Sequence, residues 1–266
     1  MAKKQDLEKR RMDLMQRHVV ELAREDFAKR YPGVDLGRAV ALIAAYEEEE
    51  NIGDVLTAMP TEACGLPLTT LVVVDGGDDR TADIIHEMGV YALVFPVNLG
   101  HGVALRAGYN LCIESGVEYV VTLDADGQND PVEIPTMLQP LVDDESDFVV
   151  GSRRLGVDHT SDFVRKAGVV FFSTLVNILT RSKLTDTSNG YRALRTSMLA
   201  DVVPRCVQVQ YQTSELIITA IRRGWRISEK PTIWHPRAHG TTKKGATALY
   251  GFRYLNVVVR TWLRER

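Results

Sequence analysis

The sequence has few cysteines, no strong excess of either charge and no long apolar run. Cys64, Cys112 and Cys206 are scattered and lack metal-ligand spacing, which favours reduced thiols in a cytoplasmic protein. The net charge of −3 gives no reason to expect nucleic acid as a partner. No segment approaches the roughly 20 apolar residues of a spanning helix, and the charged start of the chain excludes a signal peptide. We therefore expect a cytoplasmic protein that touches a membrane at most peripherally, at its inner face.

The composition is that of a globular chain. Its 266 residues, 45% hydrophobic and 25% charged, suit one large domain with or without an appendage. Short apolar runs alternate with stretches of helical periodicity, and we expect strands at residues 39–44, 70–75, 92–95 and 119–124. This alternation is typical of βαβ units. We therefore predict an α/β fold with a Rossmann-like, mostly parallel central sheet and helices on both faces.

Amphipathic helices are expected at both ends, which divides the chain into residues 1–33, 34–245 and 246–266. The first helix, at about residues 5–30, is followed by a Tyr-Pro-Gly stop, and we expect it to pack on the main domain or on a second subunit. The last one mixes basic and aromatic residues with apolar ones, which suits a membrane interface. Docking on the protein's own sheet or on a second protomer of a homodimer would give the same pattern.

The strand expected at 119–124 ends in two carboxylates, Asp124 and Asp126, followed by a flexible glycine. Charged groups at the tip of a buried strand need a compensating charge. Two carboxylates one residue apart can share a hard divalent cation such as Mg²⁺ or Mn²⁺. An acidic turn that closes the strand is the alternative that this spacing leaves open.

Polar residues follow the other expected strands as well, at 46–49, Asp75 and 98–102. In a parallel sheet the carboxyl ends of the strands share one edge, where ligands bind. Four strand ends with carboxylates and glycines at that edge favour a metal-dependent site for a phosphorylated ligand.

Seven segments, in order, resemble a known family. Residues 45–52, 73–81, 98–102 and 124–128 are similar to the successive signatures of family 2 glycosyltransferases with the GT-A fold, the last being their DxD motif. Residues 150–153, 186–192 and 237–243 resemble the dolichyl-phosphate mannose synthase branch of that family. The resemblance covers roughly residues 40–245, most of the chain.

The resemblance implies a site for a nucleotide-diphosphate sugar, GDP- or UDP-linked, with Mg²⁺ or Mn²⁺ as cofactor. Asp124, Asp126 and Gln128 are implied to hold the metal, where it would stabilise charge on the leaving group. His239 is a further candidate ligand, with an ordinary surface histidine as the alternative. The residues implied to bind the donor nucleotide are Ala45, Tyr46, Glu48, Asp75, Asn98, Gly102, Asp124 and Ala125.

Asp186 and Arg192 are the candidate catalytic residues. Asp186 stands where the family places a carboxylate near the acceptor. It would be the general base for a hydroxyl acceptor, whereas a phosphate acceptor, already ionised, needs it only to orient groups or tune the metal site. A helix cap is the alternative for Asp186. Arg192 either anchors the adjacent backbone or contacts a phosphate.

Four basic residues are candidates for binding the acceptor or a phosphate. Arg153 and Arg165 precede the apolar stretch 167–179, which suits a lipid phosphate, although an amphipathic helix packed on the sheet explains the stretch equally well. Arg237 and Lys243 lie on a loop rich in small residues, which the resemblance implies closes over the donor and contributes phosphate ligands.

The chain departs from the family pattern at several positions. Val169 replaces a serine that lipid-phosphate synthases often carry beside the phosphate, which leaves the lipid-phosphate contact open. Glu47, Val74, Gly77 and His101 replace other usual residues around the donor, in keeping with a different base or sugar.

The sequence therefore predicts a metal-dependent, inverting glycosyltransferase, a hexosyltransferase that uses a nucleotide-diphosphate sugar and a polyprenyl phosphate. A soluble hydroxyl acceptor, in a specialised metabolite or polysaccharide, is the alternative. A sugar nucleotidyltransferase would need a basic Gly-rich loop after the first strand, where this chain has Tyr46 and four acids. An inactive nucleotide-sugar-binding protein would not need Asp124, Asp126, Gln128 and Asp186 intact.

Overall fold

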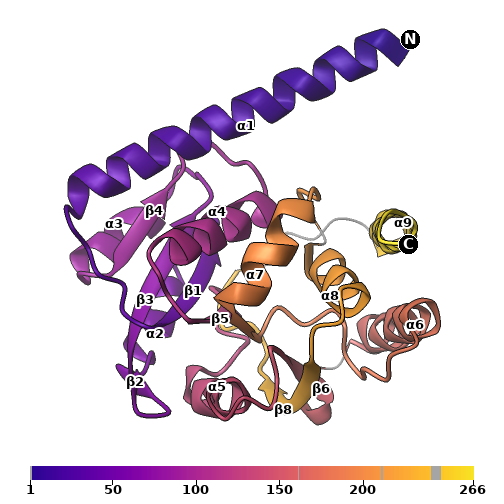
Figure 1. Ribbon diagram of the computed structural model, residues 1–266. Helices are drawn as coiled ribbons and strands as arrows, with labels where there is room; N and C mark the ends of the chain where they lie inside the picture. Colours follow the sequence, from indigo (N-terminus) through magenta and orange to yellow (C-terminus); the bar gives the residue numbers. More distant parts are fainter. Residues whose placement is uncertain (1, 161, 211, 241–246) are drawn as a thin grey trace.

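The apolar runs predicted as strands lie in one sheet in the computed structural model of the chain (Figure 1). The structure describes residues 2–160, 162–210, 212–240 and 247–266. Within these residues the sheet has eight strands, in the order β2-β3-β1-β5-β7-β6-β8 with β4 paired to β3. The strands are β1 (Ala39–Ala45), β2 (Glu62–Ala63), β3 (Leu66–Val74), β4 (Tyr91–Val94), β5 (Tyr119–Asp124), β6 (Phe148–Asp158), β7 (Arg192–Arg195) and β8 (Ile227–Trp234).

The sheet is mostly parallel, as predicted. β1 pairs in parallel with both β3 and β5, and β4 pairs in parallel with β3. On the far side of β5, β7 runs antiparallel to both β5 and β6, while β8 runs parallel to β6. Among the described strands, only β7 and the short β2 run against the common direction.

Helices cover both faces of the sheet, as predicted, because successive residues of a strand point to opposite faces. Val40 and Leu42 of β1 belong to the core under α1, α4, α7 and α8, and Ala41 and Ile43 to the core under α2, α3 and α5. The helices are α1 (Ala2–Arg30), α2 (Ile52–Thr57), α3 (Thr81–Glu87), α4 (His101–Glu114), α5 (Ile134–Val142), α6 (Phe163–Thr180), α7 (Thr196–Val202), α8 (Gln212–Arg222) and α9 (Thr247–Arg264), with the 3₁₀ turns η1 (Pro131–Glu133) and η2 (Val203–Arg205).

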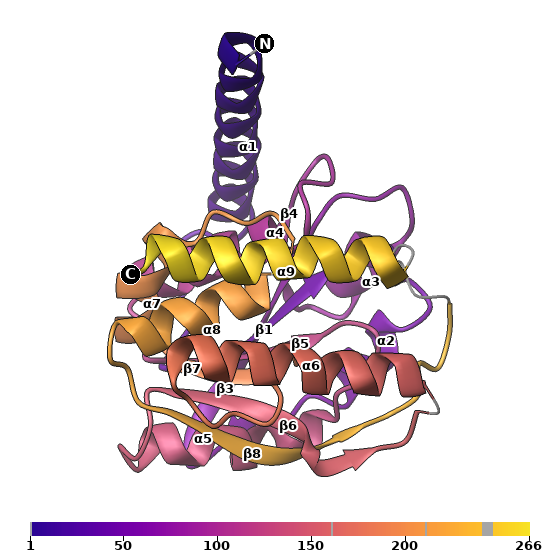
Figure 2. The ribbon, with the colours of Figure 1, turned by 90° about the vertical axis from the view of Figure 1, so that its right-hand side faces the viewer.

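The N-terminal helix α1 packs on the domain through its second half only. Val19, Ala23 and Phe27 are buried in the core, whereas Met12 and Met15 are 56% and 50% exposed. Figures 1 and 2 show the first half of α1 extending beyond the rest of the molecule. Packing on the main domain is thus one of its two predicted roles, and contact with a second subunit stays a prediction.

The C-terminal helix α9 docks on the protein itself, against α6 and α8 (Figure 2). Tyr254 and Val258 of α9 are buried, and the Tyr254 ring lies 4.2 Å from that of Phe172 on α6. The alternative of docking within the chain therefore holds, but the contacts of α9 are with α6 and α8 rather than with the predicted sheet.

Helix α6 is more exposed than a core helix. In α6 only Ser173 and Val176 are fully buried, whereas Phe163 and Ile178 are 82% and 71% exposed. By length and composition alone, α6 is the one helix among the described residues that could cross a membrane. The expectation that no segment approaches that limit is therefore wrong for α6, although α6 packs against α8 and α9 of the domain.

Candidate active site

The carboxyl ends of three neighbouring strands meet at one edge of the sheet. Ala44 of β1 lies opposite Asp124 of β5, and Ala45 lies opposite Val74 of β3. Because the strands are parallel and in register, the loops that follow them leave the sheet side by side. The structure therefore brings together the polar strand ends that the sequence places there.

Asp75, directly after β3, holds the loop that precedes α4. Its carboxylate accepts hydrogen bonds from the backbone N–H groups of Leu99, at 2.7 Å, and Gly100, at 2.9 Å. Burial raises the pKa of Asp75 to about 6, and these two hydrogen bonds only partly offset the burial. Asp75 thus positions the loop that carries Asn98 and leads to Gly102 in the first turn of α4, and its contact with the nucleobase or ribose stays a prediction.

Asp124 and Asp126 form a pair of interacting carboxylates at the end of β5. Asp126 is only 7% exposed. Burial and the negative charge of Asp124 raise the pKa of Asp126 to about 6, although the guanidinium of Arg237 and the backbone N–H of Gln128 favour its ionised form. A divalent cation beside such a pair would favour the ionised form of Asp126.

The surroundings of this pair fit a metal ion. A Cβ atom at Gly190 would lie 3.0 Å from Oδ1 of Asp124, so glycine keeps space open beside that carboxylate. Gln128 donates its amide N–H to the carbonyl of His235 at 3.1 Å, and no described residue donates to its amide oxygen. Carboxylate and amide oxygens are the ligands that Mg²⁺ and Mn²⁺ prefer.

Arg237 lies against this acidic edge. Its Nη2 donates to Oδ2 of Asp126 at 2.7 Å, and its Nη1 donates to Oε1 of Glu48 at 3.1 Å. Glu48 is 8% exposed and also accepts from the side-chain amide of Asn51 at 2.8 Å. Arg237, predicted to bind phosphate, therefore balances the charge of two predicted donor-site carboxylates.

The remaining predictions for this loop find less support. The side chain of His239 is exposed, and only its carbonyl is seen in a contact, with Asn51. In the described part of the chain, no three His, Cys, Asp or Glu side chains gather around one point, so His239 does not complete a metal shell in this structure. Lys243 lies outside the described residues.

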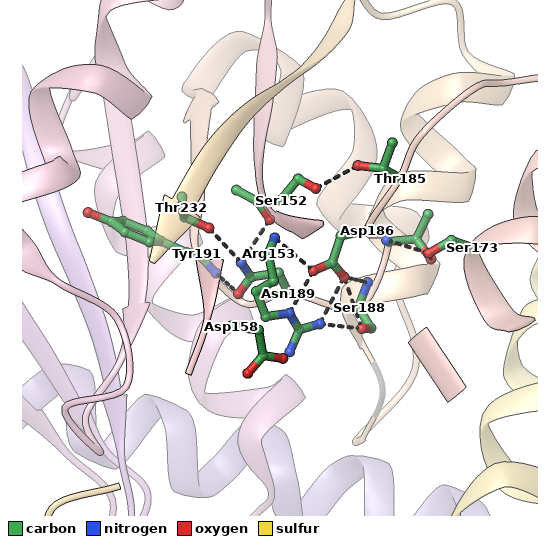
Figure 3. A network of polar contacts seen from close by, with 12 residues as sticks. Ser152, Arg153, Asp158, Ser173, Thr185, Asp186, Ser188, Asn189, Tyr191 and Thr232 are labelled. Atoms are coloured by element: carbon green, nitrogen blue, oxygen red, sulfur yellow. Dashed lines mark hydrogen bonds and ion pairs between the residues drawn. The ribbon is translucent and has the colours of Figure 1, made fainter. Parts of the chain in front are cut away.

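A buried ion pair joins Asp186 to Arg153 (Figure 3). Arg153 donates from Nε to Oδ2 at 2.6 Å and from Nη2 to Oδ1 at 2.8 Å, and also from Nη2 to the hydroxyl of Ser188 at 2.7 Å. Burial opposes the ionisation of Asp186, but the hydrogen bonds and charge of Arg153 outweigh it and hold the pKa of Asp186 below its ordinary value. Asp186 lies in the loop before β7, so the helix-cap alternative is wrong.

Glu229 on β8 holds this loop from the other side, a role that no sequence pattern near Glu229 indicates. Its carboxylate accepts from the backbone N–H groups of Thr185, at 2.8 Å, and Asp186, at 2.9 Å, and from the Thr185 hydroxyl at 3.0 Å. Asp186 thus has its side chain fixed by Arg153 and its backbone fixed by Glu229.

Arg192 is buried beside the same loop and is 1% exposed. Its guanidinium donates to the backbone carbonyls of Asn189 at 2.8 Å and Thr213 at 3.0 Å. Of its two predicted roles, the structure shows the backbone anchor, and these contacts give no support to a catalytic one.

Arg165, at the start of α6, lies beside Trp234, the last residue of β8. Its Nη2 donates to Asp158 at 3.0 Å and to the Thr160 hydroxyl at 3.1 Å. The guanidinium carbon of Arg165 lies 5.1 Å from the centroid of the Trp234 ring, and that of Arg153 lies 4.9 Å from it. The structure therefore brings together the two arginines that the sequence predicts for the acceptor.

Comparison with known proteins agrees with this geometry. The profile of glycosyl transferase family 2 matches residues 40–203. A dolichyl-phosphate hexose transferase of Haloferax volcanii is 32% identical over 85% of this chain and 94% of its own length. A polyprenol monophosphomannose synthase of Mycolicibacterium smegmatis is 27% identical over 77% of this chain and 80% of its own. In fold, the chain is similar to glucosyl-3-phosphoglycerate synthase of Mycobacterium tuberculosis, crystallised with Mn²⁺ and UDP, with a TM-score of 0.65, 16% identity, and coverage of 90% and 82% of the two chains.

Proposed function

Because the chain belongs to glycosyl transferase family 2 and is a glycosyltransferase, we propose that it moves a sugar from a nucleotide-diphosphate sugar to a polyprenyl phosphate. An oxygen of the acceptor phosphate bonds to the anomeric carbon, and the bond from that carbon to the β-phosphate oxygen breaks. The nucleoside diphosphate leaves with the electron pair. Attack opposite the leaving group inverts the anomeric centre, and no proton has to be removed from an ionised phosphate.

The ionisation and hydrogen bonding of Asp186 are the observations that favour a phosphate acceptor over a hydroxyl acceptor. A general base for a hydroxyl should have a pKa near the working pH and an oxygen free to take the proton. The pKa of Asp186 lies below its ordinary value, and both of its oxygens accept hydrogen bonds from Arg153. Asp186 is therefore a weak base but a good support for a guanidinium, which is what a phosphate acceptor requires.

The donor half of the proposal rests on the acidic edge. Asp124, Asp126 and Gln128 are the residues that would hold Mg²⁺ or Mn²⁺, with Arg237 moving from Asp126 toward the donor phosphates. When bound, the metal supplies positive charge against the pyrophosphate of the leaving nucleotide. The residues of the chain orient the donor, and Arg237 brings a guanidinium suited to bidentate phosphate contacts.

The test is a transfer assay with UDP- and GDP-sugars, each with a short-chain prenyl monophosphate, the matching prenyl alcohol, or no acceptor. We expect a sugar-phosphate product with the monophosphate and none with the alcohol. Transfer to the alcohol, or to a soluble hydroxyl acceptor in preference to the phosphate, would overturn the proposed acceptor.

We further propose that the outer face of α6 and α9 rests on the membrane surface that holds such an acceptor. On α6, Phe163, Phe171 and Ile178 are 82%, 59% and 71% exposed, and on α9 Phe252 is 68% exposed. Basic residues stand at the ends of α6 and along α9, which suits an anionic lipid surface. These residues are Arg165, Lys166, Arg181, Lys183, Arg253 and Arg260.

Sedimentation with phosphatidylglycerol-containing vesicles tests this contact. Replacing Phe163, Phe171 and Ile178 by serine should weaken binding about tenfold or more, since each large apolar side chain gains about 1.5–3 kcal/mol on full burial. The matched control replaces Met12 and Met15 of α1, which are also exposed. Equal binding by both variants and the unmodified protein would contradict the proposal.

A further inference from the structure

Trp234 is buried beside Arg153 and Arg165, and its backbone pairs with that of Asn129. It ends β8 and is 3% exposed. Its indole N–H is buried and has no hydrogen-bond partner among the described residues. An unpaired buried donor is unfavourable, so a phenylalanine would fill this position at lower cost. The position therefore uses some other property of the indole.

That property is the attraction of the aromatic ring for cations. The guanidinium carbons of Arg153 and Arg165 lie 4.9 and 5.1 Å from the centroid of the Trp234 ring. Tryptophan is the aromatic side chain that attracts a cation most strongly, and the attraction grows when the groups are shielded from water. One ring thus contacts two arginines that come from different elements, β6 and the start of α6.

A carboxylate also fixes the orientation of each guanidinium through hydrogen bonds. Arg153 uses Nε and Nη2 on Asp186, and Arg165 uses Nη2 on Asp158. No acceptor for Nη1 of either arginine is found among the described residues, so that nitrogen remains for a ligand. The carboxylates set the orientation of each guanidinium, and the shared Trp234 ring sets the position of one guanidinium relative to the other.

We propose that Trp234 is a positioning residue for the acceptor phosphate: its ring face holds Arg153 and Arg165 ready to bind the phosphate together. This inference rests on the proposed function. Two preplaced guanidiniums bind a phosphate more tightly because little side-chain freedom is lost on binding. Trp234 itself does not touch the reacting atoms.

The experiment compares Trp234→Phe and Trp234→Leu with the unmodified enzyme, using a short-chain prenyl monophosphate as acceptor. The phenylalanine weakens the ring–cation contacts and removes the unpaired N–H, so Tm should stay the same or rise. The KM for the acceptor should rise about three- to tenfold with phenylalanine, and further with leucine. The KM for the donor and the acceptor-independent hydrolysis of the donor should not change.

Trp225→Phe is the matched control. The Trp225 indole N–H donates to Asp201 at 2.9 Å, so this variant loses a hydrogen bond and should lower Tm without changing the acceptor KM. An acceptor KM in Trp234→Phe within twofold of the unmodified enzyme overturns the inference, as does a parallel rise in the donor KM. If the unmodified enzyme does not use the prenyl monophosphate at all, the proposed function fails, and the inference with it.

Discussion

The buried pair of Asp186 and Arg153 allows a sharp test of both folding and mechanism. Asp186 is fully buried, Arg153 is 8% exposed, and two hydrogen bonds of 2.6 and 2.8 Å join them. Removing one partner leaves an uncompensated buried charge, which costs about 3–5 kcal/mol. At about 2–4 °C per kcal/mol, Asp186→Ala should lower Tm by about 6–20 °C.

The assay is a double-mutant cycle by urea unfolding. Asp186→Leu and Arg153→Met are each measured alone and then together. Because the double variant replaces both charges by apolar groups, it should be more stable than the sum of the two single losses predicts, by about 2 kcal/mol or more. Additive losses would show that the two side chains do not depend on each other, and the argument for the pair would fail.

Kinetics of Asp186→Asn then separate the two acceptor classes. If Asp186 only supports Arg153, the acceptor KM should rise about tenfold with a small change in kcat. Loss of a general base would instead lower kcat by about 10²- to 10⁴-fold. A loss of that size in kcat with the prenyl monophosphate would refute the positioning role.

Three further predictions concern the donor side. In the unmodified protein, Mn²⁺ should raise the nucleotide affinity measured by calorimetry about tenfold or more, and Asp124→Asn should abolish this gain. An unchanged gain would contradict the metal role. In the absence of nucleotide, Arg237→Ala should bind Mn²⁺ about tenfold more tightly than the unmodified protein, because the guanidinium no longer competes for Asp126. Electron paramagnetic resonance measures this affinity. The raised pKa of Asp75, about 6 against an ordinary 3.8, means that the folded state binds its proton more tightly than the unfolded state. Protonation of Asp75 should therefore contribute about 2 kcal/mol of added stability as the pH falls from 7 to 4, measured as the difference in urea unfolding between the unmodified protein and Asp75→Asn at the two pH values.

Much of the sheet could be predicted because each of its predicted strands is indicated by a short, continuous segment of the sequence. The apolar runs of β1, β3, β4 and β5 are recognisable residue by residue, and each is followed by a polar end. The meeting of Asp75 and Asp124 at one edge followed from parallel pairing alone. The donor side of the site is therefore largely readable from the chain.

The acceptor side could not be predicted in the same way because its contacts are distant in sequence. Glu229 holds the backbone of Asp186 from 43 residues away, and nothing near Glu229 indicates such a partner. The roles of Arg192 depended on whether its side chain is buried, which a short strand such as β7 does not reveal. β8 is not among the strands predicted from the sequence, and no residue near Trp234 indicates its contacts with Arg153 and Arg165.

The last strand, β8, and the segment after it connect the contacts around Asp186 with those around Asp126. Glu229 meets the loop of Asp186, Trp234 meets the acceptor arginines, and Arg237, three residues on, meets the carboxylate of Asp126. Within β8, the spacing from Glu229 to Trp234 is set at about 3.3 Å per residue, and Arg237 lies in the segment directly after the strand. A slip of β8 by two residues, which keeps every side chain on its own face, would displace the contacts of Glu229 and Trp234 by the same step. The proposed donor and acceptor contacts thus depend together on the register of one edge strand.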